Sequence, residues 1–86
     1  MKKILNYIIT YIQKDENNLL IQKEEIYFSK KSMLTRYLNI LDSNNEKSFL
    51  FSEMGNSISS LKILVAYVNY DDIEDITGKI NKFIYK

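Results

Sequence analysis

The chain contains no cysteine and no histidine. Without cysteine, neither a disulfide framework nor a thiolate metal site is available. Histidine is the commonest general base and the commonest zinc ligand, so its absence argues against both kinds of site. The two glycines lie far apart and form no phosphate-binding loop. These absences favour a protein that acts without catalysis, cofactor or metal.

Long apolar runs are also missing. A membrane span takes about 18 apolar residues, and the longest run here covers residues 63–68. Lys2 and Lys3 precede apolar residues, but polar residues interrupt that stretch and no small-residue cleavage site follows. We therefore expect a cytoplasmic protein with no signal peptide and no transmembrane segment.

The overall composition is typical of one small globular domain, residues 1–86. Hydrophobic residues make up 45% and charged residues 27% of the chain, so disorder is not expected. The formal net charge is +1. Nucleic-acid-binding proteins usually carry a basic excess, because phosphate contacts supply much of their affinity. A nucleic acid partner is therefore not favoured.

Apolar residues recur at helical spacing in the second half of the chain: Phe51, Met54, Ile58, Leu61, Val65 and Val68. Steps of three and four place all of them on one side of an α-helix, whereas a strand would need alternation. Ser43 and Glu46 have the spacing of a capping box. We predict a helix over about residues 45–68, against which the rest of the chain packs.

Two segments near the chain ends show a similar pattern. Residues 3–14 contain the wide apolar face of a core-facing helix, although four isoleucines lower the helix propensity. In residues 71–84, apolar residues step by three, four and three: Ile73, Ile76, Ile80 and Phe83. Asp71 and Glu74 repeat the capping-box spacing, and lysines near the end suit the helix macrodipole. We predict a helix in each segment.

Residues 18–42 are open to two interpretations. Two rows of apolar residues recur every seven positions, and one long helix would carry both rows on one side. The polar stretch at residues 22–25 consists of good helix formers, and no glycine or proline marks a turn. The alternative is a short buried strand at residues 26–28, followed by a helix that starts after Ser32. We favour the continuous helix and leave open a break near Ser29.

Four amphipathic segments joined by short polar connections predict an all-α fold. The expected architecture is an antiparallel four-helix bundle with helices at about 3–14, 18–42, 45–68 and 71–84. A chain of this size buries only about 60% of the surface that it exposes when unfolded. Pairing into a homodimer would therefore add stability.

Few residues are candidates for chemistry. Four carboxylates near the last helix would suit calcium or magnesium: Asp71, Asp72, Glu74 and Asp75. Their spacing is not that of a calcium loop, and a helix N-terminus attracts acidic residues anyway. Ser60 and Lys62 could be considered a catalytic serine–lysine pair, but they would not face each other on a helix. We predict no catalytic, cofactor-binding or metal-binding residue.

Two surfaces are candidates for partner binding. Lys30, Lys31, Arg36 and Tyr37 form a basic and aromatic patch that a small DNA-binding regulator could use. The chain has only that one arginine, the side chain best suited to guanine contacts, which argues against this use. At the C-terminus, Ile84 and Tyr85 fall outside the apolar face of the last helix. They could contact a protein or a membrane surface, or fold back over the bundle.

The order of elements resembles the immunity proteins for pediocin-like (class IIa) bacteriocins. The similarity is strongest over residues 52–80, where Ser57-Ile58-Ser59-Ser60 precedes an apolar segment, a short turn and an isoleucine-rich end. The N-terminal part is similar in layout only. The chain departs from the family in being shorter than many members and in lacking a proline before the last segment.

The resemblance implies a non-enzymatic four-helix bundle in the cytoplasm, at the inner face of the membrane. It implies that the protein protects its producer cell by binding the bacteriocin-bound membrane component of a sugar phosphotransferase permease. Because that family recognises its target with the C-terminal half, the implied partner-binding residues are Lys79, Lys82, Ile84, Tyr85 and Lys86. The alternatives are a small DNA-binding or phage-type regulator and a helical protein–protein interaction module.

Overall fold

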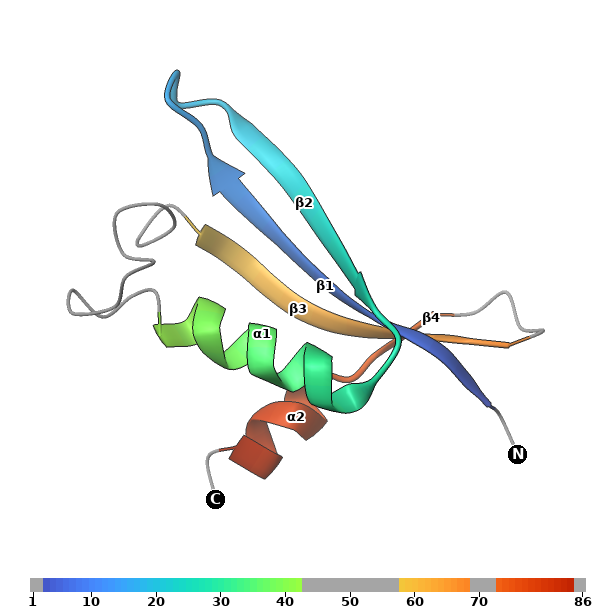
Figure 1. Cartoon of the computed structure of the whole chain (residues 1–86). Coiled ribbons are helices and arrows are strands. Elements are labelled where there is room, and N and C mark those ends of the chain that lie inside the picture. The colour runs from blue at the N-terminus through green and yellow to red at the C-terminus, as the bar shows by residue number, and fades with distance from the viewer. Residues whose placement is uncertain (1–2, 43–57, 69–72, 85–86) are drawn as a thin grey trace.

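The computed structural model describes residues 3–42, 58–68 and 73–84. Within these ranges the chain is a four-stranded antiparallel sheet with two helices (Figure 1). The elements are β1 (Ile4–Lys14), β2 (Leu20–Tyr27), α1 (Lys30–Asp42), β3 (Ile58–Tyr67), β4 (Ile73–Asp75) and α2 (Thr77–Ile84). The strand order in the sheet is β2-β1-β3-β4. The predicted all-α four-helix bundle is therefore wrong.

The inner strand β1 occupies the range 3–14 for which the sequence predicts a helix. Its isoleucines and tyrosines favour strands, because branched and aromatic side chains pack well on a pleated surface. Tyr7, Ile9 and Tyr11 point toward the helices, while Ile8 and Ile12 point to the opposite face. A strand that is apolar on both faces has the same wide apolar pattern as a core-facing helix, which explains the error.

The strand β3 contradicts the helix predicted over residues 45–68 in the part of that range that the structure describes. A β-bulge interrupts its pairing with β1, and within it Ser60 has a positive φ of 54°. The extra residue lets Ile58 and Leu61 pack against the same core although they are three positions apart. The bulge therefore produces a spacing that is otherwise typical of a helix.

The range 18–42, predicted as one helix, contains β2 and α1. The alternative interpretation, a strand followed by a helix, has the correct order of elements. Ser29 caps α1, because the backbone N–H of Ser32 donates to Ser29 Oγ at 3.1 Å. The break left open near Ser29 is thus the boundary between strand and helix.

The range 71–84, also predicted as one helix, contains β4 and α2. The helix begins at Thr77, so Glu74 lies in β4 and takes no part in a helix cap. Asp71, the other member of that predicted cap, lies outside the described residues, as do Ser43 and Glu46.

The turn between β1 and β2 is organised by Asp15. Its backbone N–H donates to the carbonyl of Leu19 at 2.9 Å, and its Oδ1 accepts from the N–H groups of Asn17 and Leu19 at 2.8 Å each. Asn18 has a φ of 64°, a left-handed conformation that asparagine tolerates better than most residues. The acidic and amide residues therefore form a turn, as their types predict, but the turn joins two strands.

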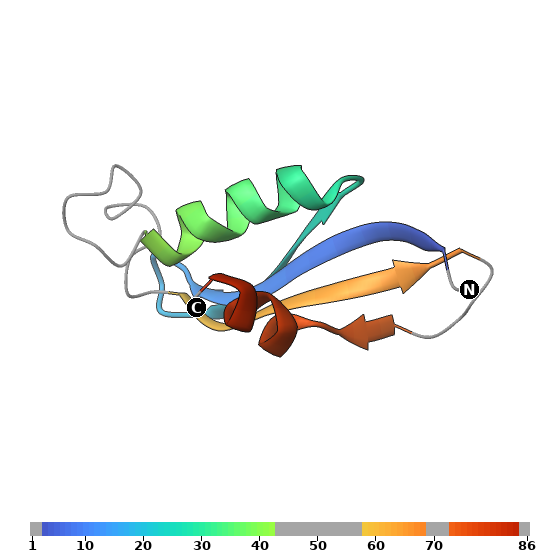
Figure 2. The ribbon, with the colours of Figure 1, turned by 90° about the horizontal axis from the view of Figure 1, so that it is seen from below.

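The two helices lie on the same face of the sheet, and Figure 2 shows α1 running above the strands. The core between these layers consists of Ile9, Tyr11, Met33, Tyr37, Ile40, Ile63 and Ile80. Tyr37 links the helices, since its hydroxyl donates to Asn81 Oδ1 at 2.7 Å. Neither helix covers the opposite face of the sheet, to which the alternate residues of each strand point.

Candidate functional site

A cleft of about 340 Å³ lies between α2 and the sheet. Ten residues from five elements and one connection line it: Ile4, Tyr7, Lys30, Val65, Tyr67, Glu74, Ile76, Lys79, Ile80 and Phe83. Seven of these side chains are aliphatic or aromatic. A concave, mostly apolar surface with a few polar groups is the usual form of a binding site. We take this α2 cleft as the candidate functional site.

The strands and helices position the walls of the α2 cleft. Tyr7 and Val65 are paired across β1 and β3, so both side chains point to the same face of the sheet. On the helix side, Ile80 packs into the main core with 5% of its surface exposed. Two cleft residues keep large exposed surfaces, 42% for Ile4 and 57% for Phe83. These two side chains can therefore meet a partner without refolding of the core.

The charged groups of the α2 cleft are two lysines and one glutamate. Lys30 Nζ lies 5.4 Å from the centre of the Phe83 ring, within cation–π range. Lys79 Nζ lies 3.0 Å from Glu74 Oε1, and the Tyr67 hydroxyl donates to Glu74 Oε2 at 2.6 Å. The lysine side chain of the ion pair is 77% exposed, so the pair is screened by water and easily exchanged for another partner.

The structure describes three of the five partner-binding residues expected from the family resemblance. Lys79 lines the α2 cleft. Lys82 and Ile84 lie on α2 but do not line it, and Ile84 packs against the core. Tyr85 and Lys86 lie outside the described residues. The strand residues of the cleft were missed because β1 and β3 were assigned to helices.

Only part of the basic patch considered for DNA binding is open to a partner, although Lys31 and Arg36 line the same hollow beside α1. Arg36 donates from Nε to Glu25 Oε1 at 2.8 Å and from Nη2 to Glu25 Oε2 at 3.1 Å. Tyr37 is 2% exposed and belongs to the core. Neither side chain is presented for base contacts, which leaves Lys30 and Lys31 as the exposed members of the patch. This arrangement argues against a DNA-binding regulator.

Glu25 is the centre of a half-buried polar network between β2, β1 and α1. Besides Arg36, the hydroxyl groups of Tyr11 and Tyr27 donate to its carboxylate. Burial alone would raise the pKa of Glu25, but these hydrogen bonds outweigh it and hold the pKa below the ordinary value. Burial and the bond to the Glu25 carboxylate raise the pKa of Tyr27 to about 12. The network fixes α1 on the β1–β2 hairpin.

Two of the four carboxylates considered as a cation site lie in the described residues. Glu74 accepts from Tyr67 and Lys79, and Asp75 Oδ1 accepts from the N–H and the hydroxyl of Thr77. The hydrogen bonds from Thr77 hold the pKa of Asp75 below its ordinary value. Asp71 and Asp72 lie outside the described residues. Each of the two described carboxylates thus has a local structural role.

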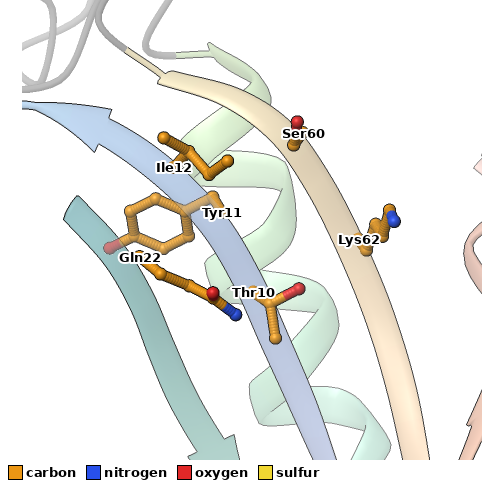
Figure 3. A pocket seen from close by; sticks show the side chains of 6 residues that line it. All are labelled: Thr10, Tyr11, Ile12, Gln22, Ser60 and Lys62. Atoms are coloured by element: carbon orange, nitrogen blue, oxygen red, sulfur yellow. The ribbon is translucent and has the colours of Figure 1, made fainter. Parts of the chain in front are cut away.

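Ser60 and Lys62, set aside on the assumption of a helix, both lie on β3 (Figure 3). They line a shallow hollow of about 220 Å³ together with Thr10, Ile12, Gln22 and Tyr11. Both side chains are exposed. The strand assignment brings them to one hollow, and of the other described residues that line it none carries a carboxylate that could activate the serine.

The chain matches no protein-family model, no curated protein and no solved structure. Of the helices in the described residues, none is both long and apolar enough to cross a membrane.

Proposed function

We propose that this chain is a non-enzymatic binding protein that holds an apolar segment of a protein partner in the α2 cleft. The observation that carries this proposal is the cleft itself. Its walls are mostly aliphatic and aromatic, and two of its large side chains, Ile4 and Phe83, are strongly exposed. Exposed apolar surface of this kind is typical of sites for protein contact.

The lysines at the α2 cleft indicate the chemistry of the partner. Lys30 and Lys79 line it, and Lys82 lies further along α2. Glu74 neutralises only part of this charge. The best-fitting partner segment carries an aliphatic or aromatic side chain with acidic residues beside it, since opposite charges speed association and fix orientation.

The particular partner that we propose is the bacteriocin-bound membrane component of a sugar permease, which would make the chain a bacteriocin immunity protein. This part of the proposal is supported by the resemblance over residues 52–80 and by the position of Lys79 beside the α2 cleft. The helical bundle that the family has is absent from the described residues. The immunity role therefore depends on the sequence pattern and not on the fold.

A protection assay tests both parts. The chain is expressed in a bacteriocin-sensitive lactic acid bacterium, and the inhibitory dose of several pediocin-like peptides is compared with an empty vector. Two variants are matched in type and exposure: Ile4→Glu places a charge in the cleft, whereas Leu38→Glu places one on α1 outside it, with exposures of 42% and 45%. We expect protection by the wild type and by Leu38→Glu, and none by Ile4→Glu.

Two results would contradict the proposal at different levels. If the wild type expresses well and gives no protection against any peptide, the immunity role is wrong. If Ile4→Glu protects as well as the wild type, the protein is an immunity protein but the α2 cleft is not its binding site. Circular dichroism of each variant shows whether the fold is kept.

A further inference from the structure

The face of the sheet opposite the helices carries an aliphatic row at its centre. Ile8 on β1 is paired with Ile26 on β2 and with Leu64 on β3, so all three side chains point to this open face. A second row pairs Ala66 with Ile73 on β4. Ile26 and Ile73 are 54% and 57% exposed. Contiguous aliphatic surface of this kind marks a contact face.

The sequence of β1 also points to cover on both faces. Sheets with one solvated face usually show apolar and polar residues in alternation, whereas strands buried on both faces read as nearly continuous apolar runs. In β1, Ile8 and Ile9 are consecutive, and Tyr11 and Ile12 are consecutive. Ile9 and Tyr11 pack under the helices. Ile8 and Ile12 therefore favour a second apolar layer on the open face.

The composition of the open face favours a protein over a nucleic acid as its binding partner. The described strand residues that point to it include no aromatic side chain, so there is no platform on which bases could stack. Its charged members are Lys14, Lys62, Glu24 and Asp75. Two lysines balanced by two carboxylates give no basic excess that would attract a phosphate backbone. An aliphatic face with balanced charges fits another protein surface.

The positions of two of these charges make the open face complementary to itself. Thr10 on β1 is paired with Glu24 on one side and with Lys62 on the other. In Figure 3, which has α1 behind the strands, Lys62 projects from β3 on the side of Thr10 away from β2. Suppose that two copies pack with their open faces in contact, related by a twofold axis that runs between the sheets and parallel to β1. This axis places β2 of each copy opposite β3 of the other copy. Each Glu24 then faces the Lys62 of the other copy.

The same axis places the aliphatic row of one copy on that of the other, with Ile8 at the centre and Ile26 opposite Leu64. Sheets that pack face to face lie about 10 Å apart, a distance that a lysine and a glutamate together can span. We propose that the open face binds a second copy of this chain, with two Glu24–Lys62 pairs flanking an aliphatic core. The α2 cleft lies on the other face, so this proposal does not depend on the proposed function.

The test uses the two charges in a swap experiment. Sedimentation equilibrium of the wild type at increasing concentration should show a monomer–dimer transition. Glu24→Lys alone leaves only lysines at these positions, and Lys62→Glu alone leaves only glutamates. Opposed like charges should raise the dimer dissociation constant about tenfold in each single variant. Both substitutions lie at exposed positions, so the fold should be kept.

An equimolar mixture of the two single variants should recover dimers, because every facing pair is again of opposite sign. The double variant should also dimerise like the wild type, and Lys31→Glu, at an exposed position on α1, serves as the control that changes nothing. A wild type that stays monomeric overturns the proposal. A dimer whose dissociation constant is unchanged by Lys62→Glu also overturns it, because such a dimer would form along the edge strand β2. A mixture of the two single variants that fails to recover dimers overturns it as well.

Discussion

Arg36 and Glu25 form a two-point ion pair that joins α1 to β2, with N–O distances of 2.8 and 3.1 Å. The side chains are 30% and 22% exposed, so the pair is partly shielded from water. Two tyrosine hydroxyls complete the shell of the carboxylate. A carboxylate with four donors is among the stronger polar contacts that a small domain contains.

We expect Glu25→Gln to lower the free energy of unfolding by about 2 kcal/mol, the range for a hydrogen bond to a charged group. Urea denaturation at neutral pH measures this loss. Glu16→Gln, at an exposed position in the β1–β2 turn, is the control and should change stability little. Equal stabilities of the Glu25→Gln variant and the wild type would mean that the network contributes nothing.

The same pair should make stability dependent on pH. The pKa of Glu25 is lower in the folded chain than its ordinary value of 4.5, so the unfolded state binds the proton more readily. The stabilisation is complete above that value and is lost as the pH falls through the folded pKa. The difference between wild type and Glu25→Gln should therefore narrow in acid. A constant difference would contradict the assigned network.

Tyr27 gives a spectroscopic test of the network. Burial, the hydrogen bond to Glu25 and the charge of Glu25 raise its pKa from 10.0 to about 12. Phenolate absorbance of the wild type minus that of Tyr27→Phe should therefore rise well above pH 10.0. Because the folded pKa is raised, the stability from this group is present below 10.0 and is lost as the pH rises toward 12. In Glu25→Gln the transition should move back toward 10.0; an unchanged transition would contradict this cause.

The sequence predicts the connections of this fold better than its strands. Two connections depend on local chemistry. The turn at Asp15 contains an asparagine in a left-handed conformation, and the break near Ser29 is a serine cap. The strands depend on distant partners. Residue spacing could not reveal that β1 is apolar on both faces or that a bulge shifts β3 by one residue.

The α2 cleft shows the same division. The family resemblance implies Lys79 as a partner-binding residue, and Lys79 lies on the short helix α2. The sequence does not identify the apolar walls of the cleft, because Ile4, Tyr7 and Val65 come from strands that meet only in the sheet. The β-branched and aromatic composition of β1 was the available signal for a strand.

Thr77 connects the start of α2 to β3. Its Oγ1 accepts from the backbone N–H of Ile63 at 2.8 Å and donates to Asp75 Oδ1 at 2.6 Å. Thr77→Val should cost about 1–3 kcal/mol, since it leaves the N–H of a fully buried residue without a partner. Thr77→Ser keeps the hydroxyl and should recover most of the loss in urea denaturation. If Thr77→Val is as stable as the wild type, the hydrogen bond contributes nothing to stability.

Tyr37 and Asn81 form a side-chain hydrogen bond between the two helices, at 2.7 Å from the tyrosine hydroxyl to Asn81 Oδ1. Tyr37 is 2% exposed, so Tyr37→Phe keeps the ring in the core and removes the hydroxyl group. We expect a loss of about 1 kcal/mol, measured by urea denaturation of Tyr37→Phe, Asn81→Ala and the double variant. Asn81→Ala should cost little more once the hydroxyl is gone, because both changes remove the same bond. Additive losses would show that the two residues stabilise the helices independently and that this bond does not hold α2 against α1.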